Sequence, residues 1–315
     1  MNQSIKIGVS TCLLGEKVRY DGGHKRDPYI IDILGQFFEF VPVCPEVEAG
    51  FPIPREAFRL VGDPDNPRLI TQKTKIDYTD RMNTWAEKRC DQLEKDELRG
   101  YIFKSKSPNS GLFRVKVYND KGMPIQKGTG LFARVFTRRF PLIPAEEEGR
   151  LNDLPLRENF IERVFVYHHW LVFKAAHSPK GLVEFHTRHK LLLMSHDVPG
   201  YRACGKLVAA IKQQPFAAII RQYEDLLMKT LAHRATVKKH INVMQHVMGH
   251  FKTHLDSDQK AELLELFESY RAGHIPLIVP ITMLNHYVRR FEVKYLKDQV
   301  YLNPHPMELK LRNHA

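Results

Sequence analysis

Three short apolar runs constrain the first half of the chain more than any other feature. Residues 5–9, 38–43 and 101–103 have the length of buried strands, and each run is followed by polar residues. Between the last two runs, residues 80–98 have the composition of a helix. Apolar runs that alternate with helical segments are typical of α/β proteins. We therefore expect an α/β domain with a mainly parallel sheet at the N-terminus.

The composition changes near residue 145. Fifteen of the 16 histidines follow this point, and residues 140–149 combine the prolines, acidic residues and glycine of a linker. We therefore predict two domains, residues 1–145 and residues 146–315.

Helical patterns fill the second domain. Apolar residues spaced by three or four positions form one seam: Val237, Ile241, Met244, Met248, Phe251 and Leu255. Asp256 and Ser257 resemble a cap before a helix that ends at Gly273, and that helix is expected to bury Leu263, Leu264, Phe267 and Tyr270. Three further helices are expected at 156–173, 182–196 and 282–290. The second domain is therefore predicted to be all-α.

The charge balance favours an anionic partner. With 48 basic and 36 acidic residues the net charge is +12, which attracts RNA, DNA or anionic lipid, although some basic proteins use such charge only for solubility. DNA is less favoured because no helix-turn-helix or zinc-finger spacing is present. No apolar run of about 18 residues is present, which excludes a transmembrane helix, and the first residues do not resemble a signal peptide. We expect no membrane partner. We expect a cytoplasmic protein.

Polar groups follow all three predicted strands. Cys12 follows the first, Cys44 and Glu46 follow the second, and Ser107 and Ser110 follow the third. Ligands of parallel sheets bind beyond the carboxyl ends of the strands, so these groups are expected to converge. Two cysteines suit a soft metal or an iron–sulfur cluster, and Glu46 suits a general base. The alternative is that both cysteines are small buried hydrophobic residues.

Two further residues are expected near a substrate because of their location. Arg55 and Lys104 lie close to these groups in the sequence and carry positive charge. Cys90, among charged neighbours, is expected at or near the surface, and Cys204 is expected in a core.

Several motifs together resemble the thiouracil desulfidase family. They are Ser-Thr-Cys-Leu-Leu-Gly at 10–15, Val-Arg-Tyr-Asp-Gly-Gly-His-Lys at 18–25, Cys-Pro-Glu-Val at 44–47, Pro-Ile-Pro-Arg at 52–55 and Lys-Ser-Lys-Ser-Pro at 104–108. The second half, with Thr-Val-Lys-Lys at 236–239, Tyr-Leu-Asn-Pro-His-Pro at 301–306 and Leu309, resembles the YbgA-like helical domain. The combination is similar to tRNA 4-thiouridine desulfidases and covers nearly the whole chain.

The resemblance implies removal of sulfur from a thiolated pyrimidine without redox chemistry. It implies a [4Fe-4S] cluster held by three cysteines, two of them matching Cys12 and Cys44, with Glu46 as the catalytic acid or base and Ser107 orienting the substrate. The implied substrate is 4-thiouridine in tRNA. Two alternatives stay open, a desulfidase of free thiouracil or thionucleosides and a non-catalytic RNA-binding protein with a degenerate cluster site.

The chain departs from the family pattern at the third cluster ligand. The loop that usually reads Ser-Pro-x-Cys-Gly has Ser110 at the cysteine position, and the alternative position after Cys-Pro-Glu-Val-Glu holds Ala49. The third ligand position is therefore vacant at Ala49 or Ser110.

Basic residues of the second domain are candidates for RNA contacts. We interpret Arg234, Lys238 and Lys239 as phosphate-binding residues, and the rings of residues 167–170 as surfaces on which bases stack. The alternative is a solvated helix face and an aromatic core. The spacing of His246, His250 and His254, and of His186 and His189, also permits a zinc site, but no cysteine or carboxylate nearby completes one.

Overall fold

The computed structural model describes residues 4–176 and 178–313. It divides the chain into two compact units, of which the first ends at Asp153 and the second begins at Leu154.

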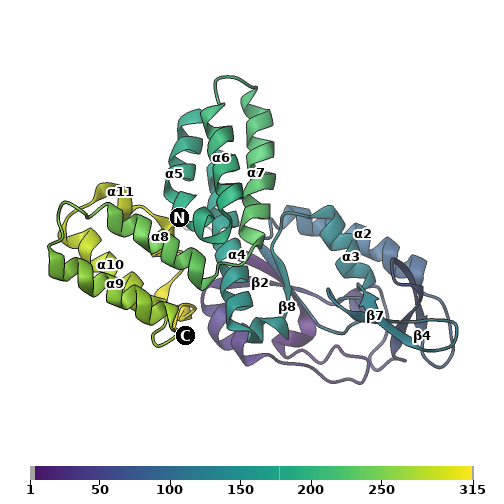
Figure 1. Cartoon of the computed structure of the whole chain (residues 1–315). Coiled ribbons are helices and arrows are strands. Elements are labelled where there is room, and N and C mark those ends of the chain that lie inside the picture. The colour runs from purple at the N-terminus through teal and green to yellow at the C-terminus, as the bar shows by residue number, and fades with distance from the viewer. Residues whose placement is uncertain (1–3, 177, 314–315) are drawn as a thin grey trace. The chain divides into compact units, whose positions relative to one another are not determined.

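A parallel sheet forms the centre of the first unit (Figure 1). Its four strands are β1 (Ile5–Ser10), β2 (Phe38–Val43), β5 (Gly100–Phe103) and β8 (Ala145–Glu147), in the order β2-β1-β5-β8. All three strand pairs are parallel. The predicted α/β class with a mainly parallel sheet is therefore confirmed.

Two helices cover this sheet. They are α2 (Thr79–Lys95) and α3 (Leu131–Arg139), and they pack against each other. Tyr101 and Phe103 of β5 stack on each other and pack with Phe132 and Phe136 of α3 in a buried cluster. The short helical turns of this unit are η1 (Thr11–Leu14), η2 (Tyr29–Ile33), η3 (Leu34–Gln36), α1 (Pro45–Glu48) and η4 (Arg150–Asn152).

The first unit also contains a second sheet, of which the sequence predicts one strand: the pattern Val-Lys-Val-Tyr at 115–118, followed by the turn residues Asn-Asp-Lys-Gly. It contains β3 (Phe58–Asp63), β4 (Asn66–Thr71), β6 (Val115–Tyr118) and β7 (Pro124–Gly128), in the order β4-β3-β6-β7. The pairs β3–β4 and β6–β7 are antiparallel, whereas β3–β6 is parallel. Its partly polar strands lack a continuous apolar run, which explains why β3 and β4 escaped the sequence analysis.

The segment expected to be a linker instead contains a strand. Within residues 140–149, β8 pairs with β5, and Glu147 is buried. The Glu147 carboxylate accepts the N–H groups of Leu112 and Phe113 at 2.8 and 3.1 Å, which explains how an acidic run occupies an interior position.

Helices make up the second unit, as predicted. They are α4 (Leu154–Ala175), α5 (Pro179–His196), α6 (Val198–Ala209), α7 (Phe216–Ala232), α8 (Val237–Gly249), α9 (Ser257–Arg271), α10 (Ile278–Arg290) and α11 (Lys294–Lys297), with the short turns η5 (Val300–Leu302) and η6 (Met307–Leu309). No helix in the described part of the chain is long and apolar enough to cross a bilayer.

The predicted seam is largely buried. The buried residues are Ile241, Met244, Phe251 and Leu255, whereas Met248 is half-buried and Val237, at the first turn of α8, is 42% exposed. Because α8 ends at Gly249, the last two buried residues lie beyond the helix. The helical structure is interrupted between α7 and α8, and the Thr236 hydroxyl caps the start of α8. The next helix begins at the expected cap, where Asp256 and Gln259 form a capping box. Leu264 is 44% exposed, so its predicted burial is wrong.

Candidate active site

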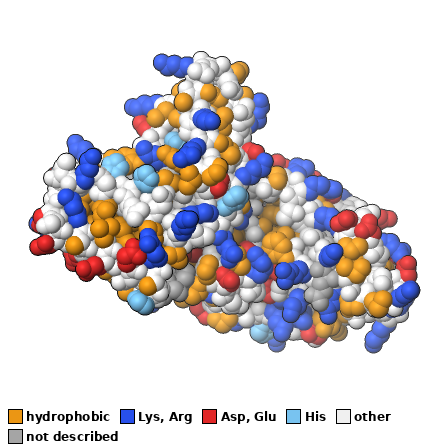
Figure 2. Space-filling model, in the orientation of Figure 1, with side chains coloured by type: hydrophobic (Ala, Val, Ile, Leu, Met, Phe, Trp, Pro, Cys, Tyr) orange, Lys and Arg blue, Asp and Glu red, His pale blue; other side chains and the backbone are white. Residues whose placement is uncertain are grey.

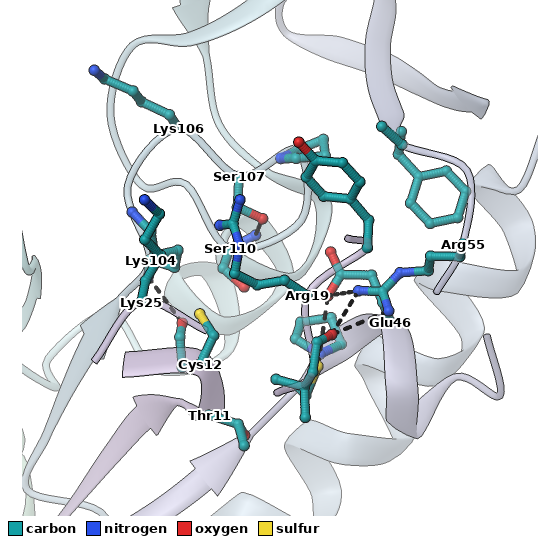
Figure 3. Close-up of a pocket in the computed structure, with 18 of the residues that line it drawn as sticks. Thr11, Cys12, Arg19, Lys25, Glu46, Arg55, Lys104, Lys106, Ser107 and Ser110 are labelled. Atoms are coloured by element: carbon teal, nitrogen blue, oxygen red, sulfur yellow. Dashed lines mark hydrogen bonds and ion pairs between the residues drawn. The ribbon is translucent and has the colours of Figure 1, made fainter. Parts of the chain in front are cut away.

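The carboxyl ends of three neighbouring strands meet at one cavity. Because β2, β1 and β5 are adjacent and parallel, the residues that follow them lie at the same edge of the sheet. A cavity of about 1100 Å³ opens there, and Cys12, Cys44, Glu46, Ser107 and Ser110 all line it. Figure 3 shows Cys12, Ser107 and Ser110 facing the same space, with Lys104 on one side and Glu46 on the other. The groups expected to converge therefore do so.

Both cysteines are held by turns at the ends of their strands. Cys12 lies in η1, which ends at Gly15 with a left-handed φ of 93°. Cys44 precedes α1, and its N–H donates to the Glu48 carboxylate at 2.9 Å. Burial raises the pKa of the Cys12 thiol to about 11 and that of Cys44 to about 12. Burial outweighs the effect of the nearby cations Lys104 and Arg55, so both thiols are protonated at neutral pH when no metal is bound.

The Glu46 carboxylate is fixed at both oxygens. The Asn109 amide donates to Oε1 at 2.8 Å, and the Arg55 guanidinium lies 3.8 Å from Oε2. The Cys44 thiol lies 3.9 Å from the same Oε2. An acid or base therefore stands next to one of the two thiols, in a cavity where a water molecule could reach it.

Ser107 presents a hydroxyl donor to the cavity. Its Oγ accepts the backbone N–H groups of Asn109 and Ser110, at 3.2 and 3.0 Å. Since a hydroxyl carries one hydrogen and two acceptor sites, these bonds leave the hydrogen available for another acceptor. A carbonyl or thiocarbonyl of a bound pyrimidine suits that donor.

The structure distinguishes the two candidate positions for a third ligand. Ser110 lines the same cavity as Cys12 and Cys44 and is 3% exposed. Ala49 is not among the described residues that line the cavity. It packs against the apolar cluster around Phe51 and Phe58, and its carbonyl accepts two bonds from Arg81. Of the two positions, only Ser110 faces the cysteines.

Positive charge dominates the cavity wall. The cations are Arg19, Lys25, Arg55, Lys73, Lys104 and Lys106, against the carboxylates Glu46 and Glu56. Such an excess attracts anionic ligands. Lys106 lies in the quoted motif at 104–108, although no role was predicted for it. The sequence does not single out Lys73, because it lies in a connection whose path depends on the tertiary fold.

The two predicted substrate cations line the cavity but are already engaged. The Arg55 guanidinium donates to the Val18 carbonyl at 3.1 Å from two nitrogens, in addition to its pairing with Glu46. The Lys104 ammonium pairs with Glu148 and donates to the Ser105 carbonyl at 3.1 Å. Arg19, whose side chain is 22% exposed, and the exposed Lys25 and Lys106 are the more accessible cations.

The other two cysteines lie in cores. Cys204 is fully buried, as predicted. Cys90 is also fully buried, so its predicted place at or near the surface is wrong. It occupies the inner face of α2 with Met82, Ala86 and Leu93, and only the flanking positions are charged.

In the helical unit, the predicted RNA-binding residues lie around the start of α8. Arg234 and Lys238 are exposed. Lys239 is half-buried, and its ammonium donates to the carbonyls of His196 and Arg234. Lys239 therefore caps the end of α5. Of the three predicted residues, only Arg234 and Lys238 have side chains exposed for contact with RNA.

The aromatic residues of α4 do not form a surface for stacking. Tyr167 and Trp170 are buried, and Trp170 stacks on Tyr223 with ring centroids 5.3 Å apart. For Tyr167 and Trp170 the expectation that the rings are offered to bases is therefore wrong, and the aromatic-core alternative holds; His168 and His169 are half-buried.

The histidine spacings do not produce a metal centre among the described residues. His186 bonds the Tyr223 hydroxyl at 2.9 Å, and His189 bonds the Phe185 carbonyl at 2.8 Å. The one group of metal-binding atoms found in the described chain is Glu158, Glu162 and His305. Arg312 already bonds both of these carboxylates, at 3.2 and 3.0 Å, and burial raises the pKa of Glu158, so little uncompensated negative charge is left to attract an ion.

Each half of the chain matches a known protein family. Residues 7–148 match the family model of 2-thiouracil desulfurase, and residues 190–306 match DUF1722, a family of unknown function. The first unit therefore carries a 2-thiouracil desulfurase domain, and it is joined to a YbgA-like domain.

Three relatives illustrate this composition. The uncharacterized protein YbgA of Escherichia coli K12 is 34% identical over 153 residues, 48% of this chain and 90% of that protein. The uncharacterized protein YbbK of Bacillus subtilis 168 is 28% identical over 153 residues, 47% of this chain and 99% of that protein. A solved structure of the [4Fe-4S]-dependent thiouracil desulfidase TudS is 30% identical, covers 49% of this chain and 97% of its own, and has a TM-score of 0.41. The chain belongs to the YbgA family and includes, in addition, the desulfurase domain.

Proposed function

We propose that this chain removes sulfur from 4-thiouridine in tRNA and leaves uridine. The observation that carries the proposal is the convergence of two thiols, the Glu46 carboxylate and the Ser107 hydroxyl on one cationic cavity. The match to 2-thiouracil desulfurase supports the reaction class. In the overall reaction, a thiocarbonyl and water give a carbonyl and hydrogen sulfide, so no electron donor or acceptor is needed.

The donor atoms in the cavity suit an iron–sulfur cofactor. Cys12 and Cys44 supply the thiolates that such clusters require, and Ser110 supplies an oxygen donor at the third position. We propose that these residues hold a [4Fe-4S] cluster. When bound, the cluster would supply an iron with an open coordination position to attract the substrate's sulfur.

The chain's own residues provide the remaining chemistry. Glu46 accepts a proton from the water that replaces sulfur, because its carboxylate lies at the cavity wall next to Cys44. Ser107 donates its hydroxyl hydrogen to the pyrimidine and so fixes the orientation of the ring. Arg55 and Lys104 contribute positive charge beside the substrate.

The size and charge of the cavity favour a substrate that carries phosphate. A volume of about 1100 Å³ lies near the upper end of the ~300–1,000 Å³ of ordinary ligand pockets, so a lone pyrimidine base would fill only part of it. The accessible cations of the cavity wall, Arg19, Lys25 and Lys106, attract phosphate groups, which a free base lacks. Both properties favour a nucleotide within RNA over free thiouracil.

The helical unit supports RNA as the substrate through its exposed basic residues. Lys and Arg side chains cover parts of both units (Figure 2). Arg234 and Lys238 are exposed at the start of α8, where they can contact a phosphate backbone. A free base would not require a basic domain.

One observation favours a second candidate function. Because Ser110 is a hydroxyl and alcohols ionise far less readily than thiols, the third position binds iron more weakly than a cysteine would. A non-catalytic RNA-binding protein with a degenerate cluster site would have the same substitution.

A competition assay separates these functions. The chain is reconstituted with iron and sulfide under anaerobic conditions, and the thiocarbonyl absorbance of 4-thiouridine tRNA is followed in the presence or absence of excess thiouracil. Loss of absorbance that thiouracil hardly inhibits supports the tRNA desulfidase. Turnover of thiouracil alone supports the free-base enzyme. Tight tRNA binding without turnover, in this chain and in Ser110→Cys, supports the binding protein.

A further inference from the structure

We infer that Asn109 is a positioning residue that holds the Glu46 carboxylate in its working orientation. The inference rests on the role of Glu46 in the proposed function. It is drawn from the contacts of Asn109, which lies in the loop between β5 and β6.

The contact between the two side chains is direct and buried. Asn109 Nδ2 donates to Glu46 Oε1 at 2.8 Å across 63 residues of sequence, and Asn109 is fully buried. Asn109 is not among the described residues that line the cavity. The amide therefore contacts the carboxylate from behind and does not contact the substrate. Oε2 is the oxygen near Cys44 and Arg55.

The backbone of Asn109 is fixed on two sides. Its N–H donates to Ser107 Oγ at 3.2 Å, and its carbonyl accepts the Ala133 N–H of α3 at 3.0 Å. Gly130 packs so closely that an added Cβ would lie 2.4 Å from the Asn109 oxygen. The rigid start of α3 thus holds the amide donor in one place.

Glu46 depends on such outside support because its own helix is short. It lies in α1, which has four residues, and its side chain is 13% exposed. A glutamate side chain has several rotatable bonds, so one turn of helix does not fix its carboxylate. The Asn109 and Arg55 contacts restrict both oxygens and leave Oε2 turned toward the cysteine.

The substitutions Asn109→Asp and Asn109→Ala test the inference. Asn109→Asp keeps the shape but replaces the donor with a second negative charge, so it should displace Glu46 further than Asn109→Ala does. Asn66→Asp, at an exposed position in the β3–β4 hairpin, is the matched control. Crystal structures of all three variants report the position of Glu46, and a thermal melt verifies that each variant is folded.

Kinetics provide a second readout. We expect both Asn109 variants to lower kcat by about 10- to 100-fold, as the loss of supporting contacts does in other sites, with KM and iron content within about twofold of the parent chain. Asn66→Asp should leave all three unchanged. An unmoved Glu46 carboxylate in folded Asn109 variants would overturn the inference, as would an unchanged kcat.

The outcomes also separate this inference from the proposed function. If the parent chain has no desulfidase activity, the proposed function fails. The position of Glu46 in the variant crystals still decides whether Asn109 orients it.

Discussion

The Arg312 guanidinium bonds the Glu162 carboxylate at 3.0 Å in the interior of the helical unit, where both side chains are almost fully buried. The same guanidinium bonds Glu158 at 3.2 Å, and His196 bonds the other Glu162 oxygen at 3.1 Å. Both carboxylates thus receive hydrogen bonds, Glu162 from Arg312 and from His196 of α5, and Glu158 from Arg312. This network links the first helix of the unit to residue 312.

Arg312→Met is expected to destabilise the chain by about 3–5 kcal/mol, because it leaves buried carboxylates without their cation. Lys229→Met removes an exposed partner of Asp225 at 2.7 Å and should cost less than ~1 kcal/mol. Urea unfolding of both variants measures the difference. Equal costs would show that the buried network contributes no more than a surface pair.

Glu46→Gln is expected to abolish turnover and leave the iron content unchanged. The amide keeps the shape of the side chain but cannot accept a proton from water. Parallel assays of desulfidation and of iron per chain measure the two effects, with Glu56→Gln, another carboxylate of the cavity wall, as the control. Unaltered turnover in Glu46→Gln would remove this residue from the mechanism.

The exposed cations at α8 are expected to contribute to tRNA binding. Arg234→Gln and Lys238→Gln should each weaken binding and reduce the slope of log Kd against log salt by roughly one per phosphate contact. Lys180→Gln changes an exposed lysine on α5 and serves as the control. Titrations over a range of salt concentrations measure the slope. If all three variants bind like the parent chain, these residues do not contact RNA.

Acid should destabilise the helical unit through its buried histidines. Burial lowers the pKa of His189 to about 3, from an ordinary value of 6.5. The neutral ring therefore stabilises the fold fully above pH 6.5, and this stability is lost as the pH falls toward 3, since the unfolded chain gains the proton first. Between pH 7 and pH 5 the loss from this residue is about 2 kcal/mol.

The substitution His189→Gln should remove that part of the pH dependence, whereas His246→Gln, at an exposed position, should retain it. Urea unfolding at pH 7, 6 and 5 measures the slope for each variant. Identical slopes for both variants and the parent chain would contradict the assignment.

The sequence predicted the elements whose pattern is local. The three apolar runs became β1, β2 and β5, and the residues beyond them met at the cavity because parallel strands share one edge. The Asp256 cap was equally readable, since the capping box lies within four residues. Motifs next to strand ends therefore identified Cys12, Cys44 and Glu46 as neighbours.

Features that depend on distant packing were missed. Nothing in the loop at 107–111 indicates that the Asn109 amide would reach Glu46, because the contact arises from how α3 holds that loop. Cys90 was misjudged from its charged neighbours, although the spacing of Met82, Ala86, Cys90 and Leu93 by four, four and three residues indicates a buried helix face. Tyr167 and Trp170 were wrongly predicted to stack on bases, because aromatic residues in a helix pack in a core more often than they bind a ligand.

We propose that Cys12, Cys44 and Ser110 hold an iron–sulfur cluster in this chain. The most direct test is the content of iron and acid-labile sulfide per chain after anaerobic reconstitution, measured beside Ser110→Cys and Ala49→Cys. We expect Ser110→Cys to hold about four irons and to bind them more tightly than the parent chain, and Ala49→Cys to add nothing. Restoration by Ala49→Cys alone, or no cluster in any of the three proteins, would contradict this assignment of the ligands.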